Sequence, residues 1–337
     1  MKKKTGAKEP IEEKVETVVL DEEDKAKDSE VLTTLNEPET FETLKSALEE
    51  NRAKVAAAQK KATVFNRIIS IVLVAACVGG FILFVQDNLV AKILAWVLIG
   101  IALVGTIIYM VYVRKAYPKI TNGYVELYFN KVNNYLFNQE GFTDCVLNKN
   151  EKYVIADIVA DRVYREIVGS NSRNIVRGKY KGYDFQFGEL ALNKKDTNPR
   201  NKAGVICFLG RHISLANNMH FEGRYIVTIS GKDIYDSPND VEDLVELVKH
   251  DNFVILGPEG SNVEKDLGKD FIKKLEAIEL SNALINVNIV FWAEHTACYL
   301  SYTDDVAVIP LEKPADEACY LSYKEDTRKF IDLLIGK

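Results

Sequence analysis

The stretch that decides the fold is IISIVLVAACVGGFILFV, residues 68–85, followed by QDNLVAK, residues 86–92, and ILAWVLIGIALVGTIIYMVYV, residues 93–113. Neither long run contains a charged residue. As helices they would span about 27 Å and about 32 Å, against a hydrocarbon core of about 30 Å. Because each backbone N–H and C=O needs an internal partner in hydrocarbon, both runs are predicted to be membrane-spanning helices. The alternative is a pair of long helices buried in a soluble core.

A short polar segment separates the two runs. Gln86, Asp87 and Asn88 are good turn formers, and Lys92 is close enough to the end of the segment for its amine to reach the membrane surface. The sequence therefore predicts a transmembrane helical hairpin over residues 67–113. Small side chains would let the two helices approach closely, although glycine is also tolerated generally in membrane helices. These small residues are Ala75, Ala76, Gly79, Gly80, Gly100, Ala102 and Gly105.

The basic residues around the hairpin predict its orientation. They cluster before the first run and after the second, whereas the connecting segment has only Lys92, offset by Asp87. The positive-inside rule then places both termini in the cytoplasm, so we expect a multi-pass protein of the cell membrane with lipid as its first partner. Five cysteines without a C-x-x-C pair suit that reducing compartment. The basic residues are Arg52, Lys54, Lys60, Lys61, Arg67, Arg114, Lys115 and Lys119.

Residues 1–38 are predicted to be a disordered acidic tail. They are rich in Glu, Lys, Asp and Thr and poor in aromatic residues, so they cannot bury enough surface to offset the entropy of ordering. Within the tail, VETVVL at 15–20 is either a short docking strand or an incidental apolar patch. Most of the net charge of −6 lies in this tail, and the rest of the chain is close to neutral. No basic face therefore indicates nucleic-acid binding.

Residues 39–66 are predicted to form an amphipathic juxtamembrane helix. Apolar residues recur there at steps of three and four, with Glu and Lys between them. The stripe is typical of a short coiled coil that would hold two copies together as a homodimer, although Asn51 occupies one inward position. The alternatives are a helix that packs on its own domain or one that lies on lipid. The stripe comprises Phe41, Leu44, Leu48, Val55, Ala58 and Ala62.

Residues 114–337 are predicted to be an α+β domain, because a helix pair is followed by strands, helices, a hairpin and a final helix without βαβ alternation. The helix starting at Ser237 has the clearest signals, since Ser237 can cap it and Pro238 fits its first turn. Helices are expected over 123–139, 151–169, 237–252, 271–282 and 316–336. Strands are expected over 178–195, 203–213, 223–230, 287–293 and 297–303, the last two as a hairpin through Glu294, His295 and Thr296.

Three segments carry a resemblance to a known family. They are GKYKGYDFQFGELAL, FEGRYIVTIS and VNIVFWAEHTACYLSY, within residues 170–337. With these patterns the chain resembles an uncharacterised family of bacterial two-span membrane proteins with a cytosolic domain of unknown function. The resemblance implies membrane attachment and supplies no activity.

One segment invites a phosphate-loop reading. LGPEGSN at 256–262 is glycine-rich, but a Walker loop requires a second glycine where Asn262 stands, so a turn between strand and helix is the alternative. The chain has no G-x-S-x-G elbow either. We therefore expect no cofactor.

Two groups of polar residues are candidates for chemistry. His295 and Cys298 beside Glu294 have the spacing of half a metal site, but zinc needs three or four ligands, and the hairpin tip is the alternative, so we expect no metal. Cys207, His212 and His220 are the residues that would complete such a site.

The catalytic candidates are Glu189, His212 and His295, with Arg211 beside His212 as a partner for Glu189. A salt bridge at a sheet edge is the alternative for Glu189. We predict a membrane-anchored cytosolic interaction or scaffold module that binds another protein. The alternative is a membrane-associated enzyme of hydrolase type whose site is assembled from distant residues. A third possibility is an accessory subunit of a transporter, since spans without charge make a poor conduit alone.

Overall fold

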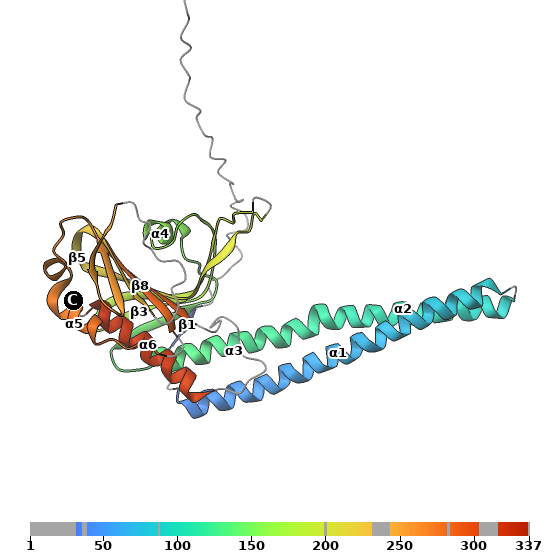
Figure 1. The fold of residues 1–337 in the computed structure, drawn as a ribbon. Helices are drawn as coiled ribbons and strands as arrows, with labels where there is room; N and C mark the ends of the chain where they lie inside the picture. The colour runs from blue at the N-terminus through green and yellow to red at the C-terminus, as the bar shows by residue number, and fades with distance from the viewer. Residues whose placement is uncertain are drawn as a thin grey trace, which may run out of the picture.

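The computed structural model describes residues 32–35, 39–86, 88–198, 201–230, 243–281, 284–302 and 316–335. A long helical hairpin projects from a domain built on a curved sheet (Figure 1). The hairpin consists of α1 (Phe41–Val85), α2 (Leu89–Val111), a π-helical turn (Tyr112–Ala116) and α3 (Tyr117–Phe137). Thr40 forms a capping box at the start of α1, and Asn88 caps α2 by accepting from the N–H of Val90 at 2.9 Å.

The predicted spans lie in the part of the hairpin that is remote from the sheet domain. Both helices are long and apolar enough to cross a membrane. Their large apolar side chains point outward: Phe81 is 72% exposed, Leu89 74% and Trp96 64%. A soluble core would bury these side chains, so the alternative of a buried helix pair does not fit.

Small residues line the contact between α1 and α2, as expected. A Cβ atom on Gly105 would lie 2.9 Å from Cδ1 of Ile69, so the helices approach closely there. Gly100 has open space beside it and takes no part in the contact. Within the two predicted spans and the turn between them, the buried small residues are Ala76, Gly80, Ala91, Ala95 and Ala102.

The first half of α1 packs on its own chain. Leu44, Leu48 and Val55 are almost fully buried and join the same core as Tyr128 and Leu136 of α3. The alternative of packing on the chain's own domain is therefore confirmed for this stripe. Dimerisation stays a prediction, and it would need a surface other than these buried side chains.

The domain is α+β with an antiparallel sheet, as predicted from the sequence. The order of neighbouring strands is β1-β2-β3-β4-β5-β7-β6, with β8 also paired to β5. The strands are β1 (Leu32–Thr34), β2 (Phe142–Asn148), β3 (Ile167–Tyr180), β4 (Tyr183–Lys194), β5 (Val205–Ser230), β6 (Val245–Lys249), β7 (Phe253–Gly257) and β8 (Leu284–Tyr302).

Strands β5 and β8 stay paired with each other and bend together near their middles. A straight strand of 19 residues such as β8 would be about 60 Å long, yet Ile285 and Ser301 at its two ends line one cavity. The bend of β8 lies at Ala293, whose φ is 48°. The predicted hairpin is wrong, because among the described residues the two arms of β8 pair with β5 and not with each other. The two arms of β8 pair with two arms of β5, residues 210–216 with 301–295 and residues 221–230 with 293–286.

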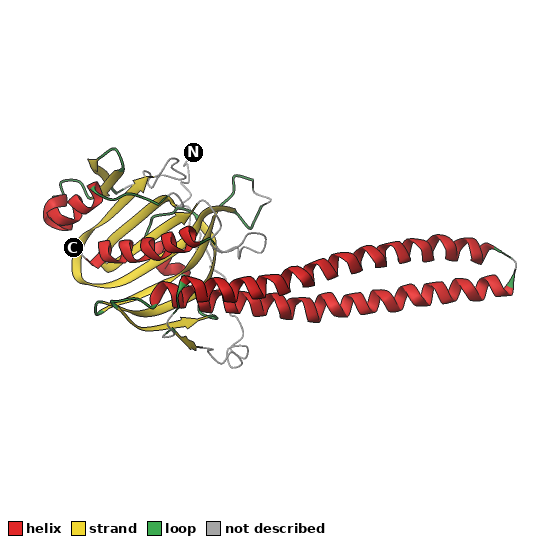
Figure 2. Cartoon of the chain, turned by 90° about the horizontal axis from the view of Figure 1, so that it is seen from below, coloured by secondary structure: helices red, strands yellow, loops and turns green. Residues whose placement is uncertain are grey.

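The two faces of the sheet carry separate cores. Helices α3, α5 (Lys269–Glu276) and α6 (Glu317–Ile335) supply residues to the larger core, and α6 lies across the strands (Figure 2). The opposite face is covered by α4 (Ile155–Ala160) and the segment after it, which form the smaller core. Neighbouring residues of a strand therefore enter different cores.

Two of the predicted helices are wrong in part. Within 151–169 only α4 is α-helical, because Arg162 takes a φ of 54° just after it and Ile167 already belongs to β3. Within 237–252, residues 245–249 form strand β6 and pair with β7, while residues 231–242 lie outside the described residues. In both places sheet pairing overrides a local helical pattern.

The predicted disordered tail is wrong at its C-terminal end. Leu32–Thr34 pairs with β2, the N–H of Leu35 donates to the carbonyl of Cys145 at 2.8 Å, and Leu35 is buried. The free edge of β2 thus binds this segment, which sequence composition does not reveal. Residues 1–31, including VETVVL at 15–20, lie outside the described residues.

Candidate functional site

Two of the three catalytic candidates converge on a residue that the sequence did not single out. Asp161 directly follows α4 and is fully buried in the smaller core. His295 Nε2 lies 3.1 Å from its Oδ1, and His212 Nε2 lies 3.9 Å from its Oδ2. The second distance is too long for a hydrogen bond but within reach of an ion pair.

Two aromatic donors complete the surroundings of Asp161. The indole N–H of Trp292 donates to Oδ1 at 2.9 Å, and the hydroxyl of Tyr299 donates to Oδ2 at 2.5 Å. The side chain of His295 is 30% exposed, whereas that of His212 is 3% exposed. The cluster therefore reaches the surface through His295.

The register of the sheet explains why these side chains meet. His212 on β5 lies opposite Gly188 on β4 and Tyr299 on β8. Gly188 leaves room for Tyr153, whose hydroxyl would lie 3.0 Å from a Cβ atom there. The Tyr153 ring packs edge-on against the His212 ring with a centroid distance of 4.7 Å. The imidazole is thus held between Tyr153 and Tyr299.

Burial and hydrogen bonding set the charges of the cluster. Burial alone would raise the pKa of Asp161, but the neighbouring imidazoles of His212 and His295 outweigh it and hold that pKa well below its usual range. Burial lowers the pKa of His212, against the opposing effect of Asp161. At neutral pH we therefore expect a charged Asp161 beside a neutral His212.

Arg224 links the last residue of α4 to Trp292 at the bend of β8. Its Nη2 donates to the carbonyl of Ala160 at 2.8 Å, and its guanidinium lies 5.4 Å from the centre of the Trp292 ring. Since Trp292 also bonds Asp161, the two segments are linked twice. This network fixes α4 on the sheet.

Glu189 does not belong to the cluster. It faces the opposite side of the sheet, where the Arg173 Nε donates to its Oε2 at 2.8 Å. Arg211 lies opposite Glu189 in the register and is buried against the rings of Phe187, Tyr302 and Tyr323. Arg211 and His212 point to opposite faces because they are neighbours in one strand. The three catalytic candidates therefore do not share a site.

The half metal site is not assembled either. Within the described residues no three His, Cys, Asp or Glu side chains are placed to hold one metal ion. Cys298 is buried in the larger core, on the face away from His295, since three residues along a strand reverse the side. The thiol of Cys207 lies against the carbonyl of Leu192, and His220 is exposed.

The glycine-rich segment at 256–262 is a turn. It connects β7 to a π-helical turn at Glu264–Gly268, with Gly260 at a φ of 81° and the Ser261 N–H donating to the Pro258 carbonyl at 3.1 Å. This confirms the alternative to the phosphate-loop reading.

Sequence reasoning missed Asp161, Trp292 and Tyr299. Asp161 was hidden in a predicted helix, where an acidic residue is ordinary. Trp292 and Tyr299 were assigned to strands without a role. Strand alternation indicates which residues of one strand share a face, but it does not relate His212 to Tyr299 on another strand, and it gives no signal for Asp161.

Comparisons with known proteins give little similarity. No protein family matches the chain, and no curated protein matches it. Among solved structures, the chain is similar to the crystal structure of the mycobacterial trehalose monomycolate transport factor A, TtfA, with a TM-score of 0.31 and 10% sequence identity. The likeness covers 60% of this chain and 89% of that one, and it is too weak to carry an argument about function.

Proposed function

We propose that the protein is a two-span membrane anchor that presents its α+β domain to another protein in the cytoplasm. The exposed apolar helices support the anchor. The basic residues that flank both spans support a cytoplasmic location of the termini and the domain.

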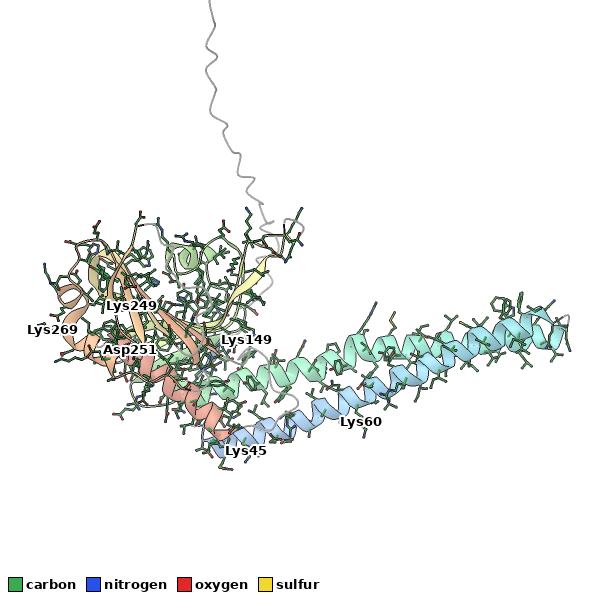
Figure 3. The ribbon with its side chains drawn as sticks, viewed as in Figure 1. Lys45, Lys60, Lys149, Lys249, Asp251 and Lys269 are labelled. Carbon is green, nitrogen blue, oxygen red and sulfur yellow. The ribbon has the colours of Figure 1, made fainter. Side chains whose placement is uncertain are left out.

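The observation that carries the proposal is the stalk between the spans and the domain. Val55 is the last residue of α1 in the larger core, and the apolar run begins at Ile68. At 1.5 Å per residue this separation is about 20 Å. The exposed stalk carries Lys60, which Figure 3 shows well away from the domain. A domain held off the membrane in this way is suited to a soluble or neighbouring protein rather than to lipid.

The helix α4 gives the proposal a surface that can be tested. Val154, Ile155 and Val159 are 60%, 41% and 46% exposed at α4, which the Asp161 network fixes on the sheet. We would place a photo-crosslinking amino acid at Val154, and a matched one at Lys60 on the stalk. The expected result is one recurring adduct from Val154 that the substitution Val159→Glu abolishes.

Two results would contradict the interaction proposal. One is purification in mild detergent that repeatedly returns the protein alone after crosslinking from Val154. The other is the same set of adducts from Val154 and Lys60, which would indicate random collisions.

The alternative function, a hydrolase-type enzyme, draws on one observation. The partly exposed His295 lies against the buried carboxylate of Asp161, an arrangement that can serve a general base. Hydrolysis of p-nitrophenyl acetate that is lost in His295→Ala and kept in His250→Ala would favour the enzyme. Equal rates for both variants would remove it.

A further inference from the structure

A cavity of about 270 Å³ lies where the two ends of β8 meet, beside the N-terminal end of β5. Tyr164 and Phe208 of the smaller core line it, and their ring centroids are 5.3 Å apart. The cavity lies next to the Asp161 cluster, because Tyr299 packs against both of these rings and donates to Asp161, but no residue of α4 lines it. Its other lining residues include Ile206, Leu209, Asn286 and Ser301.

Asn286 is the unusual residue of this cavity. It is 2% exposed, and its Oδ1 has no hydrogen-bond partner within the described part of the chain. Such a buried acceptor destabilises the fold unless something donates to it. The cavity beside it is large enough for a small molecule, since one water molecule occupies about 30 Å³ in the liquid.

Asn288 provides an internal comparison. It lies two residues further along the same strand, on the same face, and is 1% exposed. Its Oδ1 accepts from the Thr228 hydroxyl at 2.9 Å, and its Nδ2 donates to the Tyr164 hydroxyl at 3.2 Å. The fold thus satisfies Asn288 from within, whereas Asn286 lines the cavity and its Oδ1 has no partner among the described residues.

We propose that this cavity binds a small aromatic molecule that carries a hydroxyl or amide group. Its ring packs against Tyr164 and Phe208, and its hydroxyl or amide N–H donates to Oδ1 of Asn286. Lys194 also lines the cavity and disfavours a cationic ligand, because the lining residues hold no counter-charge for one. Aromatic walls with one polar contact that fixes the orientation are typical of small-molecule sites.

The test uses the full chain in amphipol and 2-naphthol as the probe, measured by equilibrium dialysis against amphipol alone. The wild type is expected to retain one equivalent of 2-naphthol. The substitution Asn286→Leu should weaken binding by at least about tenfold, the effect of losing one such hydrogen bond. Without probe, its melting temperature should equal or exceed that of the wild type, because an unpaired buried acceptor is removed.

Asn288→Leu is the matched control for folding. It removes two internal hydrogen bonds, so its melting temperature should fall while that of Asn286→Leu does not. Equal retention of 2-naphthol by the wild type and Asn286→Leu would overturn the proposal. A melting temperature of Asn286→Leu as low as that of Asn288→Leu would also overturn it, because Asn286 would then be bonded within the fold and the cavity would hold water only.

Discussion

The carboxylate of Asp161 is fully buried in the smaller core. Four side chains approach its two oxygens, and two of them, Trp292 and Tyr299, donate hydrogen bonds without carrying charge. Its charge is therefore stabilised by dipoles as well as by imidazoles. Because Asp161 directly follows α4, the protonation of this one group bears on whether α4 stays on the sheet.

The stability of the protein is predicted to fall as the pH falls from about 7 to about 5. Burial lowers the pKa of His212 in the folded chain, so the unfolded chain binds a proton in this window that the folded chain does not. Stability therefore rises with pH there, by up to about 1.4 kcal/mol per pH unit for one proton. The Asp161 contribution has a separate window: its folded pKa is depressed, so it is present above the ordinary value of about 4 and is lost below it.

The substitution His212→Phe tests this prediction. Neither ring nitrogen of His212 has a hydrogen-bond partner among the described residues, so a phenyl ring leaves no group of its own unsatisfied. Thermal unfolding at pH 5, 6 and 7 should show a smaller pH dependence in this variant than in the wild type. The exposed His250, replaced by Gln, is the control and should leave the slope unchanged. An unchanged slope in His212→Phe would assign the effect to another group.

At the scale of single residues, the sequence predicted only some members of the Asp161 cluster. His212 and His295 were singled out as possible acid–base residues that are distant in the sequence, and the structure brings them together. Glu189 was grouped with them because the sequence does not show which face a strand residue takes until the strand's limits are known. Asp161 has no distinguishing sequence context, since its environment is made by residues more than 50 positions away.

At the scale of elements, local signals predicted the helical hairpin and the final helix well. The hairpin is specified by composition alone, which is why its limits agree closely with the sequence. Strand β2 was missed because its partner β1 is distant in the sequence. Most of β3 was missed although it forms a hairpin with β4, because GSNSRN at 169–174 has no apolar alternation. Residues 245–249 were assigned to a helix because their pattern fits both structures. Sequence periodicity does not indicate which other strand a given strand pairs with.

The contact between α1 and α2 is predicted to depend on Gly105 and not on Gly100. A side chain at Gly105 would collide with Ile69, whereas Gly100 has open space. Gly105→Leu should destabilise the hairpin by about 1–3 kcal/mol, the usual effect of overpacking, and Gly100→Leu should have little effect. The midpoint of thermal unfolding in mild detergent compares the two variants. Equal midpoints would show that the helices do not touch at Gly105.

At the scale of the whole molecule, helix α1 and the sheet domain share one core. Leu44, Leu48 and Val55 of α1 contribute to the larger core, and each buried side chain of this kind is worth about 1.5–3 kcal/mol. Their sum is comparable with the total stability of a typical domain, about 5–15 kcal/mol. The predicted juxtamembrane helix (39–66) and the predicted α+β domain (114–337) are therefore not independent folding units.

Residues 114–337 expressed alone are predicted not to fold cooperatively. Removal of α1 exposes Tyr128 and Leu136 of α3, which pack against it. A chain in which a flexible linker replaces the two spans and joins 39–66 to 114–337 should recover a cooperative thermal transition. If residues 114–337 alone melt as sharply as that linked chain, the first half of α1 is dispensable for the core.

In the proposed topology, the turn between α1 and α2 and the far end of the domain lie on opposite sides of the membrane, and labelling can test this. Gln86 ends α1 at the turn, and Asp251 is exposed at the end of the domain away from the hairpin (Figure 3). In intact cells a membrane-impermeant maleimide should label Gln86→Cys and not Asp251→Cys, and permeabilised cells should label both. The unsubstituted protein controls for its own cysteines, of which Cys145 and Cys298 are buried. Labelling of Asp251→Cys in intact cells would place the domain outside, where the basic residues that flank the spans would violate the positive-inside rule.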